Sequence, residues 1–219
     1  MREEFYWSRY ASIYDEGVDY VVGRDLRLAV AARLSRERRL GEALECGCGT
    51  GFYTKTIAAH ADWVTATDIS DDMLALAAHN LASTERISFR KTSAERTPFP
   101  PRTFDTALLA NLLNTVAEPL RVLREIYRVL KYDGMLIVVV YTDYDMEPGE
   151  KLDLGLRYFQ KFGMPPTEGL HNFSPQALRG LVRQAGFLVK SVRVLGDNPK
   201  ALYSRSVKSV MLEGSNVRP

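Results

Sequence analysis

A glycine-rich segment is the part of this sequence whose residue types point most directly to chemistry. Residues 45–51 read Glu-Cys-Gly-Cys-Gly-Thr-Gly, between a short apolar run and a segment with helical spacing. Glycines at such a turn permit positive φ angles and let a ligand approach the backbone closely. Asp68 ends the next apolar run, where a carboxylate can accept hydrogen bonds from a ribose diol. The pattern predicts a nucleoside-binding site.

The glycine spacing separates this loop from two other nucleotide-binding motifs. The dinucleotide fingerprint G-x-G-x-x-G would need a glycine where Phe52 stands. A phosphate loop ends in Gly-Lys followed by Ser or Thr, and the sequence contains no Gly-Lys pair. The order acid-x-G-x-G-x-G suits a ligand with no phosphate at the mouth of the helix. A tight strand-to-helix turn that binds no ligand is the alternative.

The loop resembles the first motif of class I S-adenosylmethionine-dependent methyltransferases, in which it curls around the amino acid end of the cofactor. The resemblance runs in order over roughly residues 40–195 and is closest to the small-molecule, methyltransferase type 11-like branch. It implies S-adenosylmethionine as cofactor and S-adenosylhomocysteine as product. The later matching segments are VTATDISDDMLALAAHN (64–80), SAERTPFPPRTFDTALLANLLNTV (93–116), LREIYRVLKYDGMLIVVV (123–140) and FSPQALRGLVRQAGF (173–187).

The resemblance also implies roles for single residues of the cofactor site. Asp68 would hold the ribose hydroxyls, while Ile69 and Met73 would pack on the adenine. Ser93 stands where family members often have Asp, so an edge contact to the adenine would come from the backbone at Ala94 and Glu95. The implied cofactor-binding residues are Glu45, Gly47, Gly49, Gly51, Asp68, Ile69, Met73, Ala94, Glu95 and Asn111.

Two groups of aromatic residues could enclose a methyl acceptor. Tyr6, Trp7, Tyr10, Ile13 and Tyr14 share one face of a helix predicted within residues 1–20. That face either packs on the sheet or closes over the cofactor; Tyr14 is the leading candidate for a site contact, because residues 10–16 resemble the N-terminal motif of related small-molecule methyltransferases. Such rings could hold an apolar acceptor or a cationic amine. The second group is Tyr141, Tyr144, Tyr158, Phe159 and Phe162.

A catalytic base is not required, because orienting two bound reactants can contribute about 7 to 11 kcal/mol. His171 lies in an irregular segment where it could reach a substrate proton, so His171 and Tyr14 are the catalytic candidates. Asp143 and Asp145 follow the fifth strand, but with Asn111 as their one evident partner they make a poor oxygen site. No metal is predicted.

Alternating strands and helices must position these residues. Such alternation favours parallel pairing through right-handed crossovers, hence a Rossmann-like α/β sheet of seven mostly parallel strands with helices on both faces. The last two strands should form an antiparallel C-terminal hairpin. The predicted strands are 43–46, 63–67, 87–90, 104–110, 135–141, 187–195 and 201–207, and the helices 52–61, 73–81, 120–130 and 175–185. We expect a single domain over 1–219, with a helical cap at 1–35 and a lid at 142–173.

Composition limits the class of protein. With 219 residues, 46% hydrophobic and 26% charged, the chain suits one globular domain. Its longest apolar run, 135–141, is far below the roughly 20 residues of a membrane-spanning helix, and its two cysteines fit a reducing cytoplasm. The net charge of +2 is too small to argue for nucleic acid, and the basic residues are dispersed, so no nucleic-acid partner is expected. The acceptor, the methylated atom and the oligomeric state are left open, as are two alternatives: a cofactor-binding protein without turnover, and an RNA or protein methyltransferase.

Overall fold

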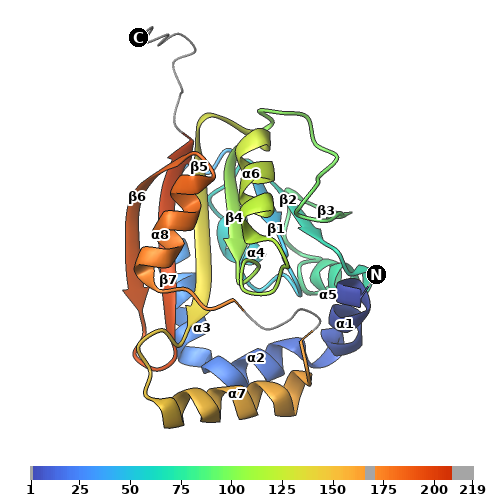
Figure 1. Ribbon diagram of the computed structural model, residues 1–219. Coiled ribbons are helices and arrows are strands. Elements are labelled where there is room, and N and C mark those ends of the chain that lie inside the picture. Colours follow the sequence, from blue (N-terminus) through green and yellow to red (C-terminus); the bar gives the residue numbers. More distant parts are fainter. Residues whose placement is uncertain (1, 166–170, 209–219) are drawn as a thin grey trace, which may run out of the picture.

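The computed structural model describes residues 2–165 and 171–208, which are built around one seven-stranded sheet (Figure 1). The strand order is β3-β2-β1-β4-β5-β7-β6, and β7 runs antiparallel to both β5 and β6, while the other pairs are parallel. The predicted sheet and hairpin are confirmed. The strands are β1 (Glu42–Cys46), β2 (Trp63–Asp68), β3 (Ile87–Lys91), β4 (Phe104–Ala110), β5 (Leu130–Thr142), β6 (Phe187–Leu195) and β7 (Lys200–Lys208).

Helices cover both faces of this sheet, and the alternation of strand side chains decides which residues each face buries. In β4, Leu108 and Ala110 pack with one cluster of buried side chains, while Ala107 and Leu109 pack with the other. The first cluster includes α3 (Arg24–Leu34), α4 (Thr54–Ala58) and α5 (Asp71–Asn80). The second includes α6 (Pro119–Val129) and α8 (Pro175–Gln184).

The ends of several helices follow the sequence signals. Ser70 accepts a hydrogen bond from the Met73 N–H at the start of α5, and Ser174 accepts one from the Ala177 N–H at the start of α8. The strand predicted at 135–141 is longer in the structure: β5 begins at Leu130, directly after α6, and its pairing with β4 shifts register between Phe104 and Thr106. The predicted helix at 52–61 is shortened to α4, since the glycine loop takes up its first residues.

Three helices form a layer below the carboxyl ends of the parallel strands (Figure 1). They are α1 (Arg2–Tyr10), α2 (Tyr14–Val22) and α7 (Pro148–Phe162). The single helix predicted within residues 1–20 is interrupted by a 3-10 turn at Ala11–Ile13, and the helix that follows, α2, packs against α7. Gly17 permits this contact, because a Cβ there would lie 2.5 Å from Phe162 Cζ.

The predicted lid, residues 142–173, contains α7, and its residues 166–170 lie outside the described part of the chain. Over the residues that are described, no helix combines the length and the apolar character needed to cross a bilayer.

Candidate active site

The glycine loop folds back onto the end of β2. Gly47, Gly49 and Gly51 have φ angles of +72°, +52° and +85°, a region that favours glycine, as the sequence predicts. The Gly47 and Cys48 N–H groups both donate to the Thr67 carbonyl, at 2.8 and 2.9 Å. The loop therefore lies at the carboxyl ends of β1 and β2, where open parallel sheets bind ligands.

A cavity of about 170 Å³ opens beside this loop. All the predicted cofactor-binding residues except Glu45 and Gly51 line it: Gly47, Gly49, Asp68, Ile69, Met73, Ala94, Glu95 and Asn111. Sequence analysis did not identify Leu112, Thr115 and Val116, which line it too. Their position directly after β4, at the same edge of the sheet as Asp68, is the signal that could have indicated them.

Glu45 and Gly51 lie behind the cavity. Gly51 is in close contact with α5, because a Cβ there would come within 2.7 Å of Leu81 Cδ1. The buried Glu45 carboxyl accepts a hydrogen bond from Thr54 Oγ1 at 2.6 Å. Burial raises the pKa of Glu45 to about 8, so this carboxyl is protonated near neutral pH.

Asp68 links the loop to the start of α5. Its Oδ2 accepts from the Gly49 N–H at 2.9 Å, and its Oδ1 accepts from the Ser70 N–H at 3.0 Å. Burial raises the pKa of Asp68, although the backbone hydrogen bonds from Ser70 and Gly49 oppose that change. The carboxyl is thus held in one orientation at the wall of the cavity.

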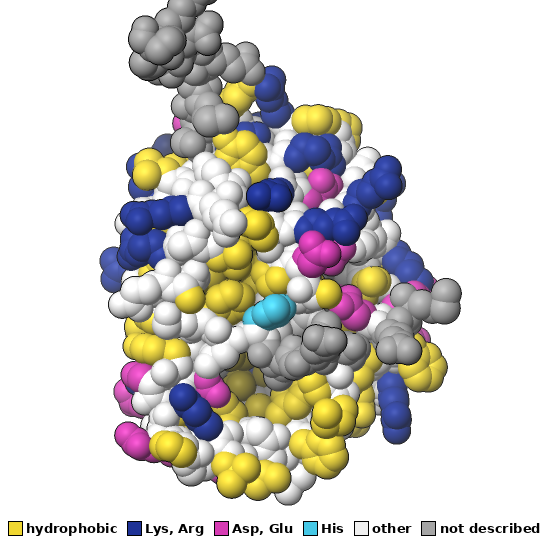
Figure 2. Space-filling view, in the orientation of Figure 1, with side chains coloured by type: hydrophobic (Ala, Val, Ile, Leu, Met, Phe, Trp, Pro, Cys, Tyr) yellow, Lys and Arg dark blue, Asp and Glu magenta, His cyan; other side chains and the backbone are white. Residues whose placement is uncertain are grey.

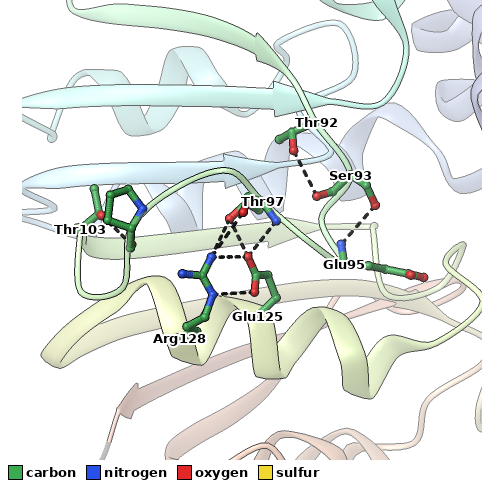
Figure 3. A network of polar contacts seen from close by, with 8 residues as sticks. Thr92, Ser93, Glu95, Thr97, Thr103, Glu125 and Arg128 are labelled. Atoms are coloured by element: carbon green, nitrogen blue, oxygen red, sulfur yellow. Dashed lines mark hydrogen bonds and ion pairs between the residues drawn. The ribbon is translucent and has the colours of Figure 1, made fainter.

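Residues 92–95 form one wall of the cavity, and the chain just after them is anchored from α6 (Figure 3). The backbone N–H and the hydroxyl of Thr97 both donate to Glu125 Oε1 at 2.7 Å, and Arg128 donates to both oxygens of the same carboxylate. Ser93 Oγ accepts from the Glu95 N–H at 3.3 Å. The backbone donor at Glu95 that the resemblance assigns to the adenine is therefore already engaged.

A second cavity, of about 240 Å³, lies between the sheet, α2 and α7. Its lining is mainly apolar and aromatic: Val18, Val21, Val22, Leu154, Tyr158 and Phe162 belong to it. Figure 2 shows hydrophobic side chains gathered over the lower part of the molecule, around α7. His171 lines the second cavity and not the first. The Asn114 backbone carbonyl accepts from the His171 N–H, and the Asn114 side-chain amide donates to the His171 carbonyl.

The two cavities adjoin, because Trp7, Tyr14, Asn111 and Thr115 line both. Burial raises the pKa of Tyr14, so its hydroxyl stays protonated, and within the described residues that hydroxyl has no hydrogen-bond partner. Asn111 adopts a positive φ of 56°, uncommon for a residue with a side chain, and its Oδ1 accepts from the Tyr141 N–H. Tyr14 and Asn111 thus both lie at the boundary between the two cavities.

The acidic residues after β5 do not form a metal centre with Asn111. Asp143 accepts a hydrogen bond from Asn172, Asp145 pairs with Lys200 at 2.5 Å, and the Asn111 oxygen is occupied by Tyr141. Across residues 2–165 and 171–208, no three His, Cys, Asp or Glu side chains converge as metal ligands would.

Comparison with known proteins agrees with this geometry. The methyltransferase domain family matches residues 44–138. A ubiquinone biosynthesis O-methyltransferase of Pseudomonas putida is 31% identical over 166 residues, which cover 72% of this chain and 69% of the relative. The chain belongs to the class I S-adenosylmethionine-dependent methyltransferases.

Other members of this methyltransferase family are similar over shorter stretches or in fold alone. A demethylmenaquinone methyltransferase of Clavibacter sepedonicus is 32% identical over 122 residues; the match covers 55% of this chain and spans about half of the relative, 50%. A possible histamine N-methyltransferase of Thermotoga maritima has a TM-score of 0.74 at 23% identity, covering 94% of this chain and all of its own. A Haloferax volcanii methyltransferase solved with its Trm112 activator has a TM-score of 0.73 at 17% identity, covering 93% and 97%.

The first cavity fits S-adenosylmethionine, the methyl donor of this methyltransferase family. Gly47 and Gly49 leave its floor without side chains; a Cβ on Gly47 would come within 3.0 Å of Leu112. Asp68 places a carboxyl on its wall, and Ile69 and Met73 give the wall an apolar surface.

Proposed function

We propose that this chain transfers the methyl group of S-adenosylmethionine to a small, largely apolar acceptor held in the second cavity. The observation that carries this proposal is the shared boundary, at which Trp7, Tyr14, Asn111 and Thr115 line both cavities. When bound, the donor supplies a sulfonium whose methyl group is activated for in-line displacement. Orientation across this boundary is then the main contribution of the protein.

Each site residue has a proposed task on its own side of the boundary. Asp68 accepts hydrogen bonds from the ribose, while Gly47 and Gly49 admit the donor close to the backbone. Tyr14, whose hydroxyl is protonated and without a partner in the described residues, orients the acceptor. His171, which lines the acceptor side, receives the acceptor's proton.

The lining of the second cavity favours a neutral acceptor that contains a ring. Tyr141, Tyr158 and Phe162 present aromatic surface, and the two charged lining residues, Asp143 and Lys151, have opposite signs. Edge and face contacts between rings stabilise such a ligand beyond simple burial. The relatives named for demethylmenaquinone and ubiquinone biosynthesis point in the same direction.

The proposal is tested first by binding and then by turnover. Calorimetry should give a micromolar or tighter affinity for S-adenosylhomocysteine and none for NADH; the reverse result would refute the cofactor assignment. Methyl-labelled S-adenosylmethionine should then label members of a panel of quinols and phenols in preference to amines. Binding without label transfer to any compound would favour the alternative of a cofactor-binding protein without turnover.

Transfer of the label to RNA or protein added to the same assay would favour the alternative of an RNA or protein methyltransferase. Such substrates call for a basic groove beside the methyl group. On the face shown in Figure 2, basic side chains gather in the upper half of the molecule, while hydrophobic ones surround α7, which supports a small-molecule acceptor.

A further inference from the structure

Asp15 joins the N-terminal helices to the glycine loop. Its Oδ2 accepts a hydrogen bond from the Thr50 hydroxyl at 2.8 Å, between residues 35 positions apart in the chain. Thr50 is buried within the loop, and its carbonyl accepts from the Asn80 side chain at 3.0 Å. The loop is therefore held from α2 on one side and from α5 on the other.

Arg27 of α3 holds Asp15 in this position. Its guanidinium donates to the Asp15 carboxylate at 2.5 Å, to the Asp15 carbonyl at 3.0 Å and to Asp19 at 2.7 Å. The Arg27 side chain is only 3% exposed and stacks 3.8 Å above the ring of Phe52, the residue that follows the loop. A planar guanidinium suits such a stacked, forked arrangement better than a lysine does.

The helix fixed in this way carries one wall of the second cavity. Tyr14 immediately precedes Asp15, and Val18, Val21 and Val22 follow on the same helix. Val18, Val21 and Val22 line the second cavity and not the first. A movement of the glycine loop would therefore be transmitted through Thr50 and Asp15 to α2. It would change the wall of the second cavity although these valines do not line the first.

We propose that Asp15 and Arg27 are positioning residues, which tie α2 to the glycine loop so that cofactor binding fixes Tyr14 and the α2 wall of the acceptor cavity. This inference rests on the proposed function, since it assigns the loop to the cofactor. Because coupling free energies are reciprocal, an ordered α2 wall would also favour cofactor binding.

The test is hydrogen exchange of the α2 amides at residues 18–22, with and without saturating S-adenosylhomocysteine. In the unmodified protein the product should slow this exchange by about tenfold, because it reduces local opening of the helix. Thr50→Val removes the hydroxyl at nearly constant volume, and calorimetry of each variant sets the product concentration that saturates it. The slowing should be absent in Thr50→Val and retained in Thr50→Ser.

Thr56→Val, on the half-buried side of α4, is the matched control and should retain the slowing. Asp15→Ala removes the carboxylate that accepts from Thr50, at a side chain that is 42% exposed. The slowing of exchange should be absent in this variant. Slowing that persists in both Thr50→Val and Asp15→Ala would overturn the inference, as would product binding to the unmodified protein without any slowing. Failure of the product to bind at all would instead refute the proposed function.

Discussion

The ring of Tyr14 lies against Gly49: a Cβ built on Gly49 would come within 3.5 Å of Tyr14 Cε1. The N–H of the same glycine donates to Asp68 at 2.9 Å. One loop residue thus meets both the aromatic side chain of α2 and the carboxyl that ends β2. The proposed donor and acceptor sites are connected at this point, and the predictions below probe each side of it.

Tyr14→Phe should slow methyl transfer by about tenfold or more while leaving stability nearly unchanged. The Tyr14 hydroxyl has no partner among the described residues, so its loss breaks no folding contact, but it removes the donor that we propose orients the acceptor. Label transfer to an acceptor found in the screen measures the rate. Tyr20→Phe, in an exposed part of α2, is the control; an unchanged rate in Tyr14→Phe would remove Tyr14 from the site.

Asp68→Ala should weaken S-adenosylhomocysteine binding by about 1 to 3 kcal/mol, or roughly 5- to 150-fold in Kd. The substitution removes the proposed ribose contact and also frees the Gly49 and Ser70 N–H groups. Calorimetry compares it with Asp72→Ala, an exposed position on α5. Equal affinities for the two variants would contradict the assignment.

The strands were predictable because each one is a short run rich in β-branched or apolar residues with a local boundary signal. Both strands of the C-terminal hairpin lie within one residue of their predicted ends, with Gly196 at positive φ in the turn between them. The loop glycines and Asp68 were predictable for a similar reason: a backbone requirement and a position at a strand end are both visible locally.

The acceptor cavity was predictable only in outline. Its walls come from α2, from the end of β5 and from α7, so its shape depends on packing between residues far apart in the sequence. The aromatic residues were visible, but the 3-10 turn at Ala11–Ile13 that redirects α2 carries no local signal. The resemblance assigns Glu45 to the cofactor site, whereas the alternation along β1 turns its side chain to Thr54.

Glu45→Gln should flatten the pH dependence of stability. Because burial raises the pKa of Glu45 from 4.5 to about 8, the folded protein keeps a proton that the unfolded chain releases between these values. The free energy of unfolding therefore falls as pH rises through this window, by up to a few kcal/mol from this group. Urea titration at pH 5.5 and 8.5 measures how much the free energy of unfolding changes between the two pH values. This change should be smaller in Glu45→Gln than in the unmodified protein, and the same as in the unmodified protein in Glu85→Gln, at an exposed position.

Gly51→Ala and Gly180→Ala should change stability in opposite directions. At Gly51 the new Cβ meets Leu81 at 2.7 Å and φ is +85°, so we expect a loss of about 1 to 3 kcal/mol in the free energy of unfolding. Gly180 lies inside α8 with nothing within 4 Å of its Cβ, and alanine there should add about 0.5 to 1 kcal/mol. Urea titration of both variants distinguishes these outcomes by sign.

The contacts of α1 and α2 with α7 also set an order of events during synthesis. The Tyr6 hydroxyl donates to the Phe162 carbonyl across 156 residues, and the same Phe162 packs against Gly17. Because α1 and α2 precede α7 in the chain, they leave the ribosome before it and remain without these neighbours until α7 has emerged. Tyr6 and Trp7 are thus exposed to chaperones and to premature contacts for longer than the strands that follow them.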